Sequence, residues 1–200
     1  MPTPTESSHG GNSDPSHLTN ASTNRHSVPW TRNKLLACVA DVKWRNMSKP
    51  INALEISGET DNPFPTLFHE KMGTSIFRGL SDQFQLNSFG VNMEVVQPGG
   101  SSGLKHWHTE SEEFVYILSG RLKLHYGEES YQLKSGDCIG FKAAEGIGHR
   151  LVNETDEEAS FLVVGSRMEN DKAVYDEDDF QWVVKDNGDW VASRKNGEPY

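Results

Sequence analysis

The chain has 200 residues and a formal charge of −10, and only 34% of its residues are hydrophobic. This length suits one domain with additional segments at its ends. The negative charge argues against nucleic-acid binding, because phosphate contacts need clustered Lys and Arg side chains.

The polar residues are concentrated at the start of the chain. Residues 1–28 are almost all Ser, Thr, Asn, Pro, Gly, His and charged residues, so we expect a disordered tail. This segment has no apolar run typical of a signal peptide, and no stretch of the chain reaches the ~20 apolar residues of a membrane span. We therefore expect a cytoplasmic protein with no membrane partner.

A mixed segment follows at residues 29–71. Leu35, Val39 and Val42 are spaced as on one face of a helix, but the pattern is short, and prolines interrupt the residues after it. We interpret residues 29–71 as an extended arm that packs on the domain or on a partner subunit.

From about residue 72 the pattern changes to short strands separated by turns. Strands are predicted at residues 89–95, 114–118, 122–126, 131–133, 138–141, 150–152 and 160–164. A hairpin is predicted where residues 180–185 and 190–193 flank Asn187-Gly188. Many short strands at such spacing predict an all-β sandwich or barrel. We place the barrel at residues 72–168 and a C-terminal extension with the hairpin at residues 169–200.

The stretch GSSGLKHWHTESEE, residues 100–113, carries the strongest functional signal. His106 and His108 are two residues apart, so on a strand both imidazoles point to the same face. Glu113 follows five residues later, and His149 lies in the later stretch GIGHRLVN. Together the four side chains would make a metal site. Imidazole and carboxylate donors suit Fe, Mn, Co, Ni or Zn, whereas three nitrogens and one oxygen do not favour Mg or Ca.

Two motifs resemble those of the cupin superfamily. The segment Gly100-x5-His106-x-His108-x4-Glu113-x6-Gly120 is similar to its first motif at every signature position. The segment from Gly136 to Asn153, which includes Gly146 and His149, is similar to its second motif, but the usual proline is absent and the loop is two residues longer. The run VVGSRMENDKAVYDEDDF and the ending SRKNGEPY also resemble small single-domain bacterial cupins labelled as sugar or sugar-phosphate isomerases.

This resemblance implies a double-stranded β-helix, which is a small jelly-roll barrel with a divalent transition metal inside one end. The family pattern assigns the metal ligands to His106, His108, Glu113 and His149. Cupins of this size commonly pair through their sheets, so the resemblance also implies a homodimer.

Two further carboxylates, Glu110 and Glu112, compete with Glu113. The six-residue gap to Gly120 favours Glu113 as the ligand, and Glu113 begins an apolar strand whose alternate residues face inward. We expect Glu110 or Glu112 to be the general base. Trp107 alternates away from the metal face, and we interpret it as packing on the sheet.

Three functions fit these residues. The first is an enzyme whose metal acts as a Lewis acid on a small oxygenated metabolite, in isomerase or lyase chemistry. The second is an Fe(II)-dependent dioxygenase. The third is a non-catalytic module that binds a small molecule. The same four ligands serve all three, so the sequence leaves the choice open.

Overall fold

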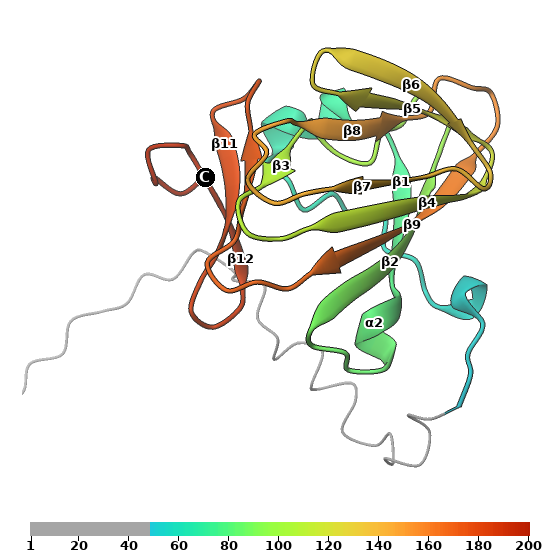
Figure 1. Ribbon diagram of the computed structural model, residues 1–200, viewed down its shortest axis with the longest axis horizontal. Helices are drawn as coiled ribbons and strands as arrows, with labels where there is room; N and C mark the ends of the chain where they lie inside the picture. Colours follow the sequence, from blue (N-terminus) through green and yellow to red (C-terminus); the bar gives the residue numbers. More distant parts are fainter. Residues whose placement is uncertain (1–48) are drawn as a thin grey trace, which may run out of the picture. The chain divides into compact units, whose positions relative to one another are not determined.

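The computed structural model describes residues 49–200, whose regular secondary structure is mainly antiparallel β-sheet (Figure 1). The predicted tail, residues 1–28, and the predicted arm as far as residue 48 lie outside the described residues. The rest of the arm contains two 3-10 helices, η2 (Ala53–Glu55) and η3 (Thr66–Lys71). Within residues 49–200, no helix has the length and apolar character needed to cross a lipid bilayer.

A five-stranded sheet forms one wall of the fold. Its order is β1 (Ser75–Gly79), β2 (Phe89–Val96), β9 (Ala159–Ser166), β4 (Glu113–Ser119) and β7 (Cys138–Phe141). All neighbouring strands are antiparallel, and a short helix, α2 (Leu80–Gln83), connects β1 to β2. Figure 1 shows β2, β9, β4 and β7 side by side, although most of these neighbours are far apart in the sequence.

Two smaller sheets form the second wall. One has the order β6 (Glu129–Lys134), β5 (Arg121–Tyr126) and β8 (His149–Val152), and the other has the order β12 (Trp190–Ser193), β11 (Phe180–Val184), β10 (Lys172–Tyr175) and β3 (Trp107–His108). They meet at an antiparallel bridge between His106 and His149, whose backbones exchange N–H···O bonds of 3.1 and 2.8 Å. This bridge connects the two sheets and places two predicted ligands opposite each other.

The main core lies between the two walls. Its buried side chains come from β2, β4, β5, β7, β8 and β9 and are Val96, Val115, Ile117, Leu122, Leu124, Phe141, Leu151, Ala159 and Phe161. Along β4, Val115 and Ile117 are buried whereas Phe114 and Tyr116 are exposed, so the predicted alternation is confirmed. Full burial of one such aliphatic side chain contributes about 1.5–3 kcal/mol, which makes this row a main source of stability.

A second apolar cluster joins the C-terminal extension to the arm. Phe68 of η3 and Leu104 pack with residues of β10 and β11 that include Tyr175 and Phe180. Phe64 meets Tyr175 edge to face, with ring centroids 5.7 Å apart. The extension therefore has its own aromatic core, which extends the fold beyond the main barrel.

The predicted all-β class is confirmed, and each predicted strand falls within an observed one or overlaps it by most of its length. The predicted hairpin is also confirmed, because β11 and β12 pair around Asn187-Gly188. Three strands, β1, the two-residue β3 and β10, are absent from the set of predicted strands. β10 reads Lys-Ala-Val-Tyr and has acidic residues on both sides, so it shows no strand pattern of its own. It forms because Ala173 and Tyr175 are buried in the second cluster.

The glycines at both ends of the first motif are required by the packing of the backbone. A Cβ at Gly100 would lie 2.5 Å from the backbone oxygen of Thr74. Gly120 has a φ of +72°, and a Cβ there would lie 2.7 Å from the Cβ of Ala159. These two motif positions are explained by chain packing and need no contact with a ligand.

Glu94 is a buried carboxylate on β2. It lies opposite Phe161 of β9, so it shares the face of the sheet that packs on the core, and only 8% of it is exposed. Burial raises the pKa of Glu94 to about 8, although a hydrogen bond with Ser75 opposes this shift. The folded protein therefore keeps a proton on this carboxyl at neutral pH.

We expect Glu94→Gln to stabilise the protein at neutral and alkaline pH. The pKa of Glu94 is about 8 in the folded state and near 4.5 in the unfolded chain. Between these values the folded state binds more protons, so the free energy of unfolding of the wild type falls as pH rises from 4.5 to 8. The Gln variant does not lose stability in this way. Its free energy of unfolding should therefore exceed that of the wild type by on the order of 1–3 kcal/mol at pH 8.

Urea unfolding at pH 5 and pH 8 measures the difference. Glu128→Gln, which changes an exposed Glu in the turn between β5 and β6, is the matched control and should show no such pH dependence. A stability difference that is the same at both pH values would contradict the assignment of the buried proton.

Candidate metal centre

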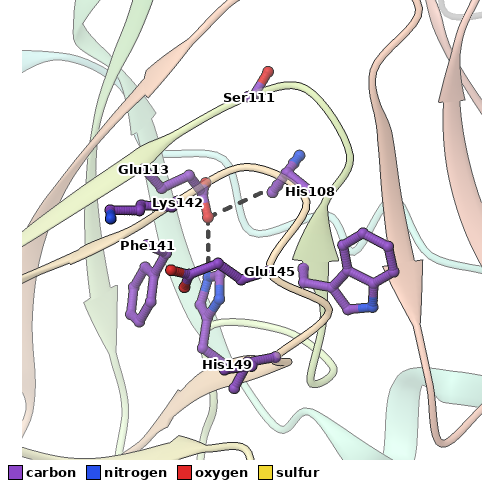
Figure 2. A pocket seen from close by; sticks show the side chains of 9 residues that line it. His108, Ser111, Glu113, Phe141, Lys142, Glu145 and His149 are labelled. Atoms are coloured by element: carbon purple, nitrogen blue, oxygen red, sulfur yellow. Dashed lines mark hydrogen bonds and ion pairs between the residues drawn. The ribbon is translucent and has the colours of Figure 1, made fainter.

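The four predicted ligands come together where the two walls face each other. His106 and His108 flank Trp107 at β3, His149 begins β8, and Glu113 begins β4 in the opposite wall. The Oε2 atom of Glu113 lies 2.9 Å from Nε2 of His149, 3.7 Å from Nε2 of His108 and 3.9 Å from Nε2 of His106. Figure 2 shows the contacts of Glu113 with His108 and His149 as dashed lines.

Three of the four residues form the tightest group. One ligand atom from each of His106, His108 and Glu113 lies within 4.8 Å of the other two. His149 is not a member of this group, although it makes the shortest contact with Glu113. The side chain of His149 therefore meets the other ligands through the Glu113 carboxylate.

The Nδ1 atoms of His106 and His108 make hydrogen bonds with residues outside the ligand cluster. Nδ1 of His106 donates to the backbone oxygen of Leu104 at 2.9 Å, and Nδ1 of His108 contacts Oδ2 of Asp171 at 2.7 Å. A carbonyl oxygen or a carboxylate can only accept, so each Nδ1 carries a proton. In the neutral form of each ring, Nε2 then presents its lone pair towards Glu113, as a metal ligand must.

Stacking on aromatic rings also orients the rings of His149 and His106. The ring of His149 is stacked on Phe141 with centroids 3.6 Å apart and an interplanar angle of 2°. His106 is stacked on Tyr175 with centroids 5.2 Å apart. Nδ1 of His149 is buried and has no hydrogen-bond partner within residues 49–200, so the ring is oriented by its stacking on Phe141 and by the contact of its Nε2 with Glu113.

The electrostatic environment favours the ligand forms of His106 and Glu113. Burial, together with the neighbouring His149, lowers the pKa of His106 to about 3, so its imidazole is neutral. Burial alone would raise the pKa of Glu113, but the hydrogen bond from His149 and the charges of the neighbouring histidines lower it to about 2. Burial likewise acts to lower the pKa of His108, but the hydrogen bond to Asp171 and the charge of Glu113 raise it overall.

The donor set fits a divalent transition metal. Ligand atoms at about 2.0–2.2 Å from one ion lie roughly 3–4 Å from each other, which matches the distances around Glu113. Three imidazole nitrogens and one carboxylate oxygen suit Fe, Mn, Co, Ni or Zn. Within the described part of the chain, no Lys or Arg forms an ion pair with Glu113 or Asp171, so the cluster can accept positive charge from an ion.

A small cavity that is open to solvent lies beside the cluster. Three of its lining residues are the predicted ligands His108, Glu113 and His149. The others are Trp107, Ser111, Phe141, Lys142, Glu145 and Ile147, several of which are labelled in Figure 2. The cavity therefore brings a cation and a second carboxylate to the cluster.

The longer second-motif loop supplies much of this wall. Residues 142–148 connect β7 to His149, and the backbone N–H of Ala144 donates to the oxygen of His108 at 2.8 Å. Ala144, which stands near the position of the missing proline, has a φ of +59°. The loop therefore docks on β3 and brings Lys142 and Glu145 to the cavity.

The two expected general bases do not reach the cavity. Glu110 and Glu112 are exposed, and neither lines it. Strand alternation does not apply there, because residues 109–112 form a turn between β3 and β4. Trp107, interpreted from the sequence as packing on the sheet, also borders the cavity, and its Nε1 donates to Asp176.

Comparisons with known proteins were made with both sequence and structure. The family model described as Cupin domain matches residues 92–165. A sugar phosphate isomerase of the cupin superfamily from Silicibacter pomeroyi is 32% identical, with a TM-score of 0.70 over 76% of this chain and 96% of that one. A protein from Acidithiobacillus ferrooxidans, provisionally assigned as a sugar phosphate isomerase, is 24% identical, with a TM-score of 0.65 over 79% of this chain and 98% of that one. This second likeness supports the fold alone.

One sequence relative has a different assigned chemistry. Polyketide synthase CurC from Streptomyces cyaneus is 33% identical over 72 residues, which are 36% of this chain. The chain spans only 45% of that relative's length.

We expect the protein to bind close to one divalent transition metal ion per chain. A variant that carries both His106→Ala and His149→Ala removes two of the four donors and should lose the metal. The affinity should fall by more than the roughly 10–100-fold typical for loss of an outer-sphere partner. Elemental analysis of untagged protein after dialysis measures this, and equal metal content in both proteins would contradict the site.

Proposed function

The protein belongs to the cupin superfamily, and we propose that it is a metal-dependent enzyme that isomerises a small oxygenated metabolite, with sugar phosphates as the first substrate class to test. The observation that carries this proposal is the His/Glu cluster at the edge of a cavity that also holds Lys142 and Glu145. A metal site, a cation and a free carboxylate are the groups that such a reaction needs. The likeness to the Silicibacter pomeroyi isomerase supports the substrate class.

In this proposal His106, His108, Glu113 and His149 hold the metal, which supplies Lewis-acid polarisation of a substrate carbonyl. The rings keep their orientation without adjustment, because Leu104, Asp171, Tyr175 and Phe141 already hold them. The apolar residues Val115 and Ile117 lie below Glu113 on β4 and keep water from that side of the site.

Glu145 is the proposed general base. Its Oε2 accepts a hydrogen bond from the hydroxyl of Tyr126 at 2.9 Å, which fixes the carboxylate and leaves Oε1 available. The carboxylate would take the proton from the carbon next to the carbonyl and return it to the neighbouring carbon. Together with passage of the adjacent hydroxyl proton to the former carbonyl oxygen, this transfer converts an aldose into a ketose with no change in overall composition.

Lys142 is the proposed contact for the anionic group. It lines the cavity, and within residues 49–200 its amine forms no ion pair with a carboxylate. An unpaired ammonium group at the mouth attracts a phosphate without first breaking an internal contact. Lys142 lies three residues before Glu145 in the same loop, so both side chains move with one segment.

The Fe(II) dioxygenase and the non-catalytic binding module remain alternatives. Both can use the same four ligands, but neither requires a proton-transferring carboxylate beside them. Glu145 at the cavity therefore favours isomerisation. Turnover that needs air would favour the dioxygenase, and a ligand that raises the melting temperature yet is recovered unchanged would favour the binding module.

We expect the metal-loaded protein to exchange a substrate C–H proton for solvent deuterium when it is incubated with a panel of sugar phosphates in D2O. Proton NMR measures the loss of the signal. Glu145→Gln should slow the exchange by about 10²–10⁴-fold, because the amide cannot accept the proton. Glu110→Gln and Glu112→Gln are the competing variants, and a larger effect of either would favour the base predicted from the sequence.

The homodimer also remains a proposal. The outer face of β4 exposes Phe114 and Tyr116, which are 44% and 40% accessible and could be covered by a second copy. Light scattering should then give a mass of about twice the 22.4 kDa of one chain. Phe114→Glu should shift the mass towards one chain, and a wild-type mass of 22.4 kDa would remove the proposal.

A further inference from the structure

We infer that Asp171 is a positioning residue of the metal centre, so that the C-terminal extension forms part of the centre. The inference rests on the proposed metal site and adds to it a residue outside the four ligands. Asp171 lies just before β10, beyond the residues 92–165 that the cupin family model matches. The motif pattern therefore contains no information about it.

The carboxylate of Asp171 is fully buried and uses both of its oxygens. Oδ2 accepts from Nδ1 of His108 at 2.7 Å. Oδ1 accepts from the backbone N–H of Glu110 at 2.9 Å, from that of Ser111 at 3.3 Å and from the hydroxyl of Thr109 at 3.2 Å. Both oxygens accept hydrogen bonds and neither is left to carry a proton, so the side chain is a carboxylate anion.

These contacts act on the ligands at two points. The bond to His108 fixes the ring and its Nδ1 proton, which directs Nε2 towards Glu113. The bonds to residues 109–111 hold the turn that connects His108 to Glu113. One side chain thus sets both the angle of one ligand and the path of the chain to the next.

The extension holds Asp171 firmly in this position. β10 pairs with β3, so that Ala173 lies opposite His108, and the backbone oxygen of Asp171 accepts from Val184 at 3.1 Å. Tyr175, on the same strand, is stacked on His106. The extension therefore contacts two of the three histidines, and the aromatic cluster behind it resists displacement.

Metal affinity of the full-length protein tests the inference. We expect Asp171→Asn to weaken Co²⁺ and Zn²⁺ binding by about 10–100-fold in competition with a chelator. The visible spectrum of the Co²⁺ form should also change, because one imidazole is then less firmly oriented. Asp176→Asn is the matched control. Asp176 accepts a hydrogen bond from Trp107, which is the neighbour of His108 on β3, but it contacts no ligand ring. Its affinity and spectrum should equal those of the wild type.

The outcomes separate this inference from the proposed function. A wild type that binds no metal would overturn the proposed site and this inference with it. Wild-type binding that Asp171→Asn leaves unchanged would overturn the inference alone, as would an equal loss in Asp176→Asn. If Asp171→Asn fails to fold, NMR of the Zn²⁺-loaded wild type decides. We expect a downfield, slowly exchanging Nδ1 proton on His108, and its absence would overturn the inference.

Discussion

The antiparallel bridge between His106 and His149 is the interaction on which the candidate site depends. Residues that face each other across such a bridge point to the same side, so one backbone contact brings together two imidazoles from segments 43 positions apart. His108, two residues from His106, then points to the same side. A shift of one residue in this pairing would turn an imidazole away and separate the ligands. The same bridge joins the two small sheets into one wall.

The opposite wall contributes the negative charge. Glu113 lies at the end of a row whose next inward residues, Val115 and Ile117, are buried in the main core. Its neighbour on β9 is Gly165, whose missing side chain leaves room beside the carboxylate. The charged cluster has buried apolar side chains on one side and a polar opening on the other, so water screens its charges poorly from the apolar side. Electrostatic interactions with an ion or a substrate are therefore stronger there than at the open surface.

The residues that the sequence predicted correctly belong to regular strands, and those it predicted wrongly belong to turns. Alternation along β4 accounts for Glu113 and for the buried side chains that follow it. It does not apply to Glu110 and Glu112, because β3 ends at His108 and the chain then turns around Asp171. It says nothing about Glu145, which reaches the cavity only because the loop before His149 docks on the backbone of His108. A side-chain direction in a loop depends on what the loop contacts, and a local pattern does not contain that contact.

By itself, the sequence determined the all-β class, most of the strands, the hairpin at Asn187-Gly188 and the four side chains with metal-ligand chemistry. The strands and the hairpin follow from local periodicity and spacing, which are properties of neighbouring residues, whereas the set of four ligands follows from the resemblance to the two cupin motifs. Only the tertiary structure decided that Asp171, 63 positions from His108, orients its ring, and that Tyr175 covers His106. The extension contains several acidic residues of similar local context, and the pairing of β10 with β3 selects one of them. Such a choice is made by long-range contact, because burial and hydrogen bonding act through space and not along the chain.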